Sequence, residues 1–149
     1  MLRTIVFSLL LVFVLIVFVD VPPVQAQDNE AFVVIVNEAN SLRTASRSEI
    51  SNWFIKKVTS WGNGLAIRPV DLVPASPVRA EFTSYVHGKK VSAIQSYWQK
   101  QIFSGSGTPP AEKKTESEVL AYVRSNPGAV GYVSASSNVG GVRVLKISD

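Results

Sequence analysis

The stretch Val70–Val86, VDLVPASPVRAEFTSYV, decides the fold of this chain. A short apolar run ends at Pro74, and a helical pattern begins at Ser76, a residue that often caps helices, with Pro77 at the favoured first position. Apolar residues then recur at helical spacing, namely Val78, Phe82, Tyr85 and Val86. The stretch therefore predicts a strand that leads through a tight turn into a helix.

The first turn of this helix is a candidate anion-binding site. Backbone N–H groups at a helix start lack partners within the helix, and a strand, turn and helix start often hold an anion there. The candidate ligands are the Ser76 hydroxyl, the amides of Val78 and Arg79, and the Arg79 guanidinium. The same residues also fit an ordinary capped helix whose arginine lies in solvent, so both interpretations stay open.

The first 26 residues predict a signal peptide, which leaves residues 27–149 as one domain. Arg3 precedes the apolar run Ile5–Val19, and Val24-Gln25-Ala26 fits a small-residue cleavage site. The pattern indicates export to the periplasm. An uncleaved N-terminal membrane anchor is the alternative, because the apolar run is close to the length that spans a bilayer.

Composition excludes several classes of function. The chain has no cysteine and one histidine, His87, so we expect no zinc site, no cofactor and no catalytic residues. His87 falls near the end of the Ser76 helix, where a cation is favoured and capping explains it. The net charge is +4, but the basic residues are scattered, so nucleic acid is not an expected partner.

The rest of the chain alternates strand and helix patterns, which predicts an α/β domain with a mixed sheet. Expected strands are Ala31–Val36, Leu65–Val73, Ala129–Val133 and Val142–Ile147, and Pro69 places the second at an edge or in an irregular position. Helices are expected from capping boxes at Ser46 and Thr115, the first reaching Val58, and over Ser92–Phe103. The helix aromatics are expected in the core, namely Trp53, Phe54, Phe82, Tyr85, Tyr97, Trp98 and Phe103.

A glycine-rich loop, SGSGTPP, follows the Ser92–Phe103 helix. Ser104, Gly105, Gly107 and Thr108 could form a nest of backbone amides, which makes the loop a secondary anion-binding candidate. The lysine and helix that complete a phosphate loop do not follow, so a plain flexible loop is the alternative.

The order of motifs resembles the periplasmic substrate-binding proteins of ABC phosphate transporters, and more closely the small one-lobe members of that superfamily. The motifs are FVVIVN, SRSEISNWFIKKVTSWGNG, PVDLVPASPVRAEF, YWQKQIFSGSGTPP and VLAYVRSNPGAVGYV, which together cover most of residues 31–133. The resemblance implies a single α/β lobe of the type II periplasmic-binding-protein kind, with a mixed sheet flanked by helices.

The resemblance also implies a function, which is binding of phosphate or a related oxyanion for ABC transport or sensing. Larger members carry a Ser-Gly-Thr phosphate-binding turn where this chain has Ser76-Pro77-Val78, and their arginine precedes the turn whereas Arg79 follows it. Expected partners are an ABC permease or an envelope sensor, and a homodimer could complete the cleft. The alternative is a non-enzymatic structural or interaction protein of the envelope that keeps the fold without tight ligand binding.

Overall fold

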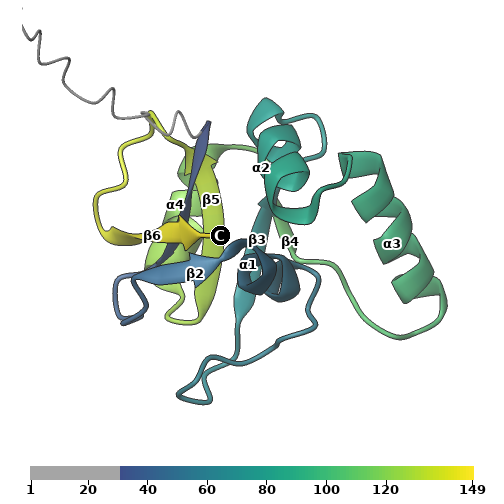
Figure 1. Ribbon diagram of the computed structural model, residues 1–149, viewed down its shortest axis with the longest axis horizontal. Coiled ribbons are helices and arrows are strands. Elements are labelled where there is room, and N and C mark those ends of the chain that lie inside the picture. The colour runs from purple at the N-terminus through teal and green to yellow at the C-terminus, as the bar shows by residue number, and fades with distance from the viewer. Residues whose placement is uncertain (1–30) are drawn as a thin grey trace, which may run out of the picture.

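The computed structural model describes residues 31–149, which form a mixed α/β domain (Figure 1). The six strands of its sheet follow the order β2-β6-β1-β5-β3-β4. β1 runs antiparallel to β5 and β6, while β3 runs parallel to β4 and β5, and β2 runs parallel to β6. The strands are β1 (Phe32–Asn37), β2 (Thr44–Ser46), β3 (Arg68–Leu72), β4 (Ala111–Lys113), β5 (Ala129–Ser134) and β6 (Val142–Ser148).

Four helices accompany the sheet: α1 (Arg47–Phe54), α2 (Pro77–His87), α3 (Val91–Phe103) and α4 (Glu116–Ser125). α4 covers one face, and α1 and α2 cover the other, while α3 packs on α2 and stands away from the sheet (Figure 1). Between residues 31 and 149, none of the helices has the length and apolar character needed to span a membrane. The predicted signal peptide, residues 1–26, lies outside the described residues.

Local capping chemistry sets the helix starts as the sequence predicts. α1 and α4 each begin with a complete capping box, Ser46 with Glu49 and Thr115 with Glu118. α2 begins at Pro77 and ends before Gly88, whose positive φ of 61° suits the left-handed residue that terminates many helices.

α1 is shorter than the sequence pattern predicts. It ends at Phe54 rather than Val58, because Lys56 adopts a positive φ of 56° that breaks the helix. Val58 is 42% exposed, so its helical spacing from Phe54 was fortuitous. The predicted extension of this helix is therefore wrong.

β3 lies between β5 and β4, so the predicted edge position of this strand is also wrong. Arg68 donates its N–H to Gly128 on the β5 side, which points Pro69 toward β4. β4 pairs only with Val70–Leu72, so the missing N–H of Pro69 falls beyond its end. The two three-residue strands, β2 and β4, were not predicted, because such short segments carry no hydrophobic period.

An aromatic cluster joins α1 and α2 to the sheet. Phe82 of α2 stacks on Tyr132 of β5 with ring centroids 3.8 Å apart, and Phe54 and Phe32 pack around the pair. On the opposite face, Gly131 lets α4 approach, since a Cβ there would lie 2.9 Å from Val119. The helix aromatics thus form much of the core, as predicted, with two exceptions described next.

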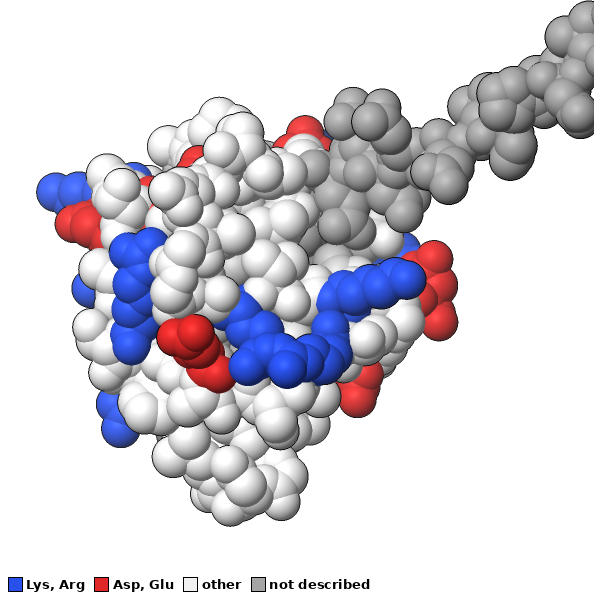
Figure 2. Space-filling view, turned by 90° about the vertical axis from the view of Figure 1, so that its left-hand side faces the viewer, with Lys and Arg blue, Asp and Glu red and all other residues white. Residues whose placement is uncertain are grey.

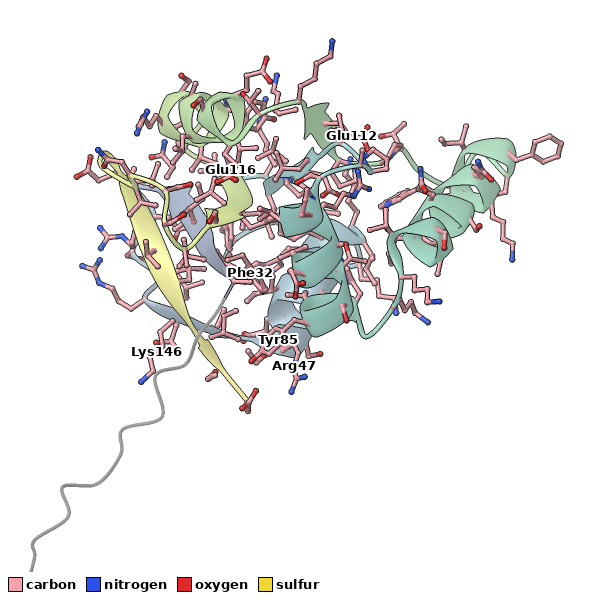
Figure 3. All side chains as sticks on the ribbon, turned by 90° about the horizontal axis from the view of Figure 1, so that it is seen from above. Phe32, Arg47, Tyr85, Glu112, Glu116 and Lys146 are labelled. Atoms are coloured by element: carbon pink, nitrogen blue, oxygen red, sulfur yellow. The ribbon has the colours of Figure 1, made fainter. Side chains whose placement is uncertain are left out.

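Two aromatic residues predicted to be buried are exposed. Phe103, at the end of α3, is 97% exposed because α3 extends beyond the groups that it packs on. Tyr85 is 39% exposed, and its ring lies beside Phe32 and 5.0 Å from the Arg47 guanidinium (Figure 3). The aromatic ring of Tyr85 therefore serves as a partly solvated cation–π partner.

The face that carries β2 and β6 shows a row of basic side chains with acidic side chains beside it (Figure 2). Opposite charges are thus interspersed on this face, and it presents no broad field of one sign. Elsewhere, Arg47 at the start of α1 and Asp149 after β6 form an exposed ion pair at 3.3 Å.

Candidate functional site

The start of α2 carries the residues predicted to bind an anion, and it brings Ser76, Val78 and Arg79 together. The Ser76 hydroxyl oxygen accepts the Arg79 backbone N–H at 3.3 Å, and the Ser76 carbonyl accepts the Ala80 N–H. Pro77 has no N–H, and the Val78 N–H finds no acceptor among residues 31–149. The first turn contains no acidic residue. One amide, one hydroxyl hydrogen and the positive end of the helix dipole are therefore available there.

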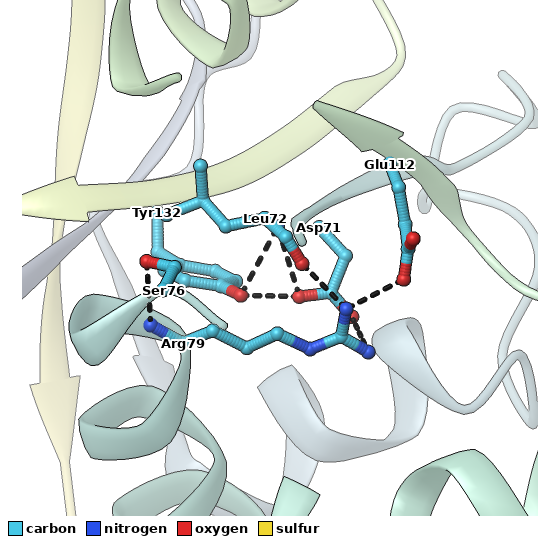
Figure 4. A network of polar contacts seen from close by, with 6 residues as sticks. All are labelled: Asp71, Leu72, Ser76, Arg79, Glu112 and Tyr132. Carbon is cyan, nitrogen blue, oxygen red and sulfur yellow. Dashed lines mark hydrogen bonds and ion pairs between the residues drawn. The ribbon is translucent and has the colours of Figure 1, made fainter. Parts of the chain in front are cut away.

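The Arg79 side chain is buried in a network of ion pairs (Figure 4). It is 3% exposed, and its Nη1 donates to the Leu72 carbonyl at 2.5 Å and to Glu112 Oε2 at 2.6 Å. Its Nη2 lies 3.2 Å from Asp71 Oδ2. The sequence left two interpretations open, an anion-binding arginine and an arginine in solvent. Neither includes these contacts, because the carboxylates come from two strands, β3 and β4. Arg79 joins α2 to two strands.

Asp71 is the buried acid of this network. The Tyr132 hydroxyl donates to its Oδ1, and the Leu72 N–H donates to the same oxygen at 3.1 Å. Burial raises the pKa of the Asp71 carboxyl, the Arg79 charge and the Tyr132 bond act against that rise, and the Glu112 charge adds to it. Burial next to Asp71 likewise raises the pKa of the Tyr132 phenol, which keeps its proton to donate.

Asp71, Glu112 and Tyr132 were missed as partners of Arg79. One signal was available: Asp71 stands between the apolar residues Val70 and Leu72, where an unpaired buried charge is costly, which indicates a buried polar or basic partner. Sequence spacing could not identify that partner, because Glu112 lies 33 residues after Arg79 and on an unpredicted strand.

A small pocket of about 180 Å³ opens beside the network. Asp71, Arg79 and Glu112 form its charged wall, and Trp98 and Ile102 of α3 contribute apolar side chains. The pocket is thus large enough for a small ion with water.

The glycine-rich loop lies at the end of α3, and none of its hydrogen bonds involves the α2 start. The Gly105 and Ser106 amides donate to the carbonyls of Ile102 and Gln101, and the Ser104 hydroxyl donates to Lys100 and Gln101. These groups bond to the last carbonyls of α3, as C-terminal capping groups do. Anion binding by Ser104, Gly105, Gly107 and Thr108 stays a prediction.

His87 does not act as a cationic helix cap. Its Nδ1 lies 2.8 Å from the Ser51 hydroxyl, and burial, together with the positive charges of Arg79 and Lys89, lowers its pKa from 6.5 to about 4. The imidazole is therefore neutral near pH 7, and the capping explanation is wrong. Among the described residues, no group of His, Asp and Glu side chains could hold a metal ion.

The fold matches solved structures of phosphate receptors. An ABC-type phosphate transport receptor from Vibrio cholerae aligns with 78% of this chain at a TM-score of 0.63 and 20% identity. A possible phosphate binding protein from Planctomyces limnophilus aligns with 80% at 0.61 and 20% identity. PstS from Borrelia burgdorferi aligns with 80% at 0.56 and 15% identity.

The aligned part is less than half of each receptor, namely 46%, 42% and 47% of those chains. No protein-family model and no curated protein matches the sequence. The resemblance first indicated by the sequence motifs is thus confirmed as a resemblance of fold: the described residues have the fold of one lobe of phosphate ABC transporter substrate-binding proteins.

Proposed function

We propose that this chain is a non-enzymatic binding module of the periplasm that takes phosphate or a related oxyanion for ABC transport or sensing. The observation that carries the proposal is the start of α2. There the Ser76 hydroxyl, the Val78 N–H and the positive end of the helix dipole meet on a turn without an acid. The similarity of fold to phosphate receptors supports the class of ligand.

In this proposal the Arg79 guanidinium is buried inside the domain, so it acts on the anion through its charge and does not clamp it with both Nη atoms. Its Nη atoms are bonded to Leu72, Asp71 and Glu112, and its buried Nε–H is the donor that has no partner among the described residues. Asp71 is buried and bonded to Tyr132 and Leu72, so the acid beside Arg79 that an incoming anion would meet at the surface is the partly exposed Glu112. Removing the Glu112 charge is therefore expected to strengthen binding of an oxyanion.

Calorimetric titration of the purified protein with phosphate and with sulfate tests this proposal. We expect saturable binding of phosphate, weakened in Ser76→Ala and strengthened in Glu112→Gln. Thr115→Ala is the matched control, since Thr115 caps α4 as Ser76 caps α2 but begins a helix whose first turn already holds two glutamates. Equal binding by Ser76→Ala and the parent would place the anion elsewhere.

A second candidate is an interaction protein that keeps the fold without a tight ligand. The observation that favours it is the occupied Arg79 guanidinium, whose single positive charge is paired with two carboxylates. Such a protein would contact an ABC permease or an envelope sensor directly. Absence of saturable binding for both anions in a protein that is folded by circular dichroism would establish this candidate over the first.

A homodimer offers one way to complete a cleft, since the chain aligns with less than half of each receptor. A second copy would then face the start of α2. Sedimentation velocity with and without phosphate measures this directly, and a phosphate-dependent shift from monomer to dimer is the expected result.

A further inference from the structure

A second concave site lies at the opposite end of α2 from Ser76. It is a groove of about 430 Å³ between the end of α1, the end of α2 and one flank of α3, within the size range of small-molecule sites. α2 has 11 residues, so the groove lies about 16 Å along the helix from the proposed oxyanion site. The lining residues are Ser51, Ile55, Lys57, His87, Lys89, Ala93, Ile94, Ser96, Tyr97 and Lys100.

The groove has an apolar floor that is fixed by contacts between its walls. Ile94 is buried, and the side chains of Ile55 and Tyr97 are half-buried beside it. The Tyr97 hydroxyl donates to the Ile55 carbonyl at 3.5 Å, which ties α3 to the end of α1. The floor is thus built into the fold and suits an apolar ligand body.

The rim of the groove is positive. Lys57, Lys89 and Lys100 are exposed, and none of the ten lining residues is an acid. The carboxyl ends of α1 and α2 each contribute roughly −0.5 of an elementary charge, about −1 together, which three lysines exceed. His87 adds a neutral polar group, whose Nδ1 is already bonded to Ser51. The excess positive charge over an apolar floor is complementary to an anion with an apolar body.

We propose that this groove binds a small anionic amphiphile, with the apolar part on Ile55, Ile94 and Tyr97 and the acidic group among the three lysines. The ligand class is an alkyl or aryl carboxylate or its sulfonate analogue. This site is separate from the start of α2 and does not depend on oxyanion binding there. An acidic peptide would need to bury a backbone in the groove, whereas a small carboxylate fills it without that cost.

Decanoate, below its micellar concentration, is the probe for this site. Titration into the ¹⁵N-labelled purified full chain is followed by amide chemical shifts and by calorimetry. We expect saturable shifts at residues of the α1 end, the α2 end and the adjoining flank of α3, and no such shifts with decyltrimethylammonium, which has the same chain and the opposite charge. Equal binding of the cation would overturn the proposal.

Two sets of variants localise the effect. Lys57→Ala/Lys89→Ala/Lys100→Ala is expected to weaken decanoate binding about tenfold, and Lys113→Ala/Lys114→Ala/Lys146→Ala, which removes the same charge elsewhere, to change it less than twofold. Ala93→Glu places a carboxylate in the groove at an exposed helical position, so it is expected to abolish binding while the protein stays folded. Ser92→Glu is its neighbouring control outside the groove.

Three further results would contradict the proposal. They are no saturable shifts with decanoate, equal weakening by both triple-lysine variants, and undiminished binding by a folded Ala93→Glu protein. Binding of an acidic peptide in the groove without binding of decanoate would also overturn it, because the ligand class would then be wrong.

Discussion

α2 and α4 lie on opposite faces of the sheet, and they stabilise their N-termini by different means. α4 does so locally: Thr115 and Glu118 form a capping box, and Glu116 and Glu118 place two acids in the first turn. α2 has the Ser76 cap alone, no acid in its first turn, and Arg79 bonded to carboxylates of β3 and β4. The positive end of the α4 dipole thus lies beside acids of the helix itself, while the Val78 N–H at the α2 start has no acceptor among the described residues.

This difference shows that a shared local motif can serve two purposes. In α4 the cap and the acids lie at the amide end of the helix, and Glu116 also accepts the Ser134 N–H of β5 at 2.8 Å and the Ser137 hydroxyl. In α2 the charged residue of the first turn is a cation that binds carboxylates of the sheet, and no acid lies at the amide end. The variants below test the two helices against each other, from the largest expected effect to the smallest.

Arg79→Met is expected to give the largest loss of stability, about 3–5 kcal/mol in the free energy of unfolding, because Asp71 would stay buried without its cation. Arg124→Met in α4 is the matched control, since the Arg124 side chain is exposed and, among the described residues, donates only to the Gly140 carbonyl. It should cost less than about 1 kcal/mol. Urea unfolding measures both, and equal losses would contradict the contrast between the helices.

The two helices also differ at their last turns, where α2 carries neutral His87 and α4 carries Arg124. The pKa of His87 falls from 6.5 to about 4 on folding, so below pH 6.5 the unfolded chain binds a proton that the folded chain rejects. Stability attributable to His87 is thus present above pH 6.5 and lost as the pH falls toward 4, by roughly 2–3 kcal/mol.

The measurement is the free energy of unfolding between pH 7 and pH 4 for the parent and for His87→Asn. His87 is the one histidine in the sequence, so the difference between the two curves isolates it from the carboxyl groups. A difference that does not change with pH would show that His87 titrates normally in the folded protein.

Tyr132→Phe tests the buried end of the α2 network without disturbing its aromatic stack. The ring stays against Phe82, but Asp71 loses one hydrogen-bond donor. We expect a loss of about 1–3 kcal/mol, since a buried acceptor is left with fewer partners. Tyr122→Phe in α4, where the ring is half-buried beside Lys113, should change stability by less than about 0.5 kcal/mol. Thermal unfolding of both variants provides the comparison.

The smallest expected effect compares the caps themselves. Ser76→Ala and Thr115→Ala should each lower stability by about 1 kcal/mol, because each removes the side chain that accepts the third amide of its helix. Added phosphate should raise the melting temperature of the Thr115→Ala protein more than that of Ser76→Ala. An equal rise in melting temperature in both proteins would show that phosphate does not bind at the α2 start.

The elements with local signals could be predicted from the sequence. Capping boxes at Ser46 and Thr115, the cap at Ser76 and the terminating Gly88 placed four helix ends, because each signal acts within a few residues. The end of α1 could not be predicted, since it depends on the backbone of Lys56.

The candidate site was predictable only in part. Ser76, Val78 and Arg79 are adjacent in the chain, so their proximity was certain once a helix was expected. The pairing of Arg79 with Asp71 and Glu112 depends on β3 and β4 lying side by side, which is a tertiary contact without a local signal. The neutral state of His87 likewise depends on burial against α1.

The central claim is that the start of α2 binds an oxyanion beside an arginine that is already paired. Calorimetric titration of phosphate into the parent protein and into Glu112→Gln tests it most directly. We predict saturable binding that becomes tighter in Glu112→Gln, because the acid 2.6 Å from Arg79 Nη1 no longer competes. No saturable phosphate binding by either folded protein would contradict the claim.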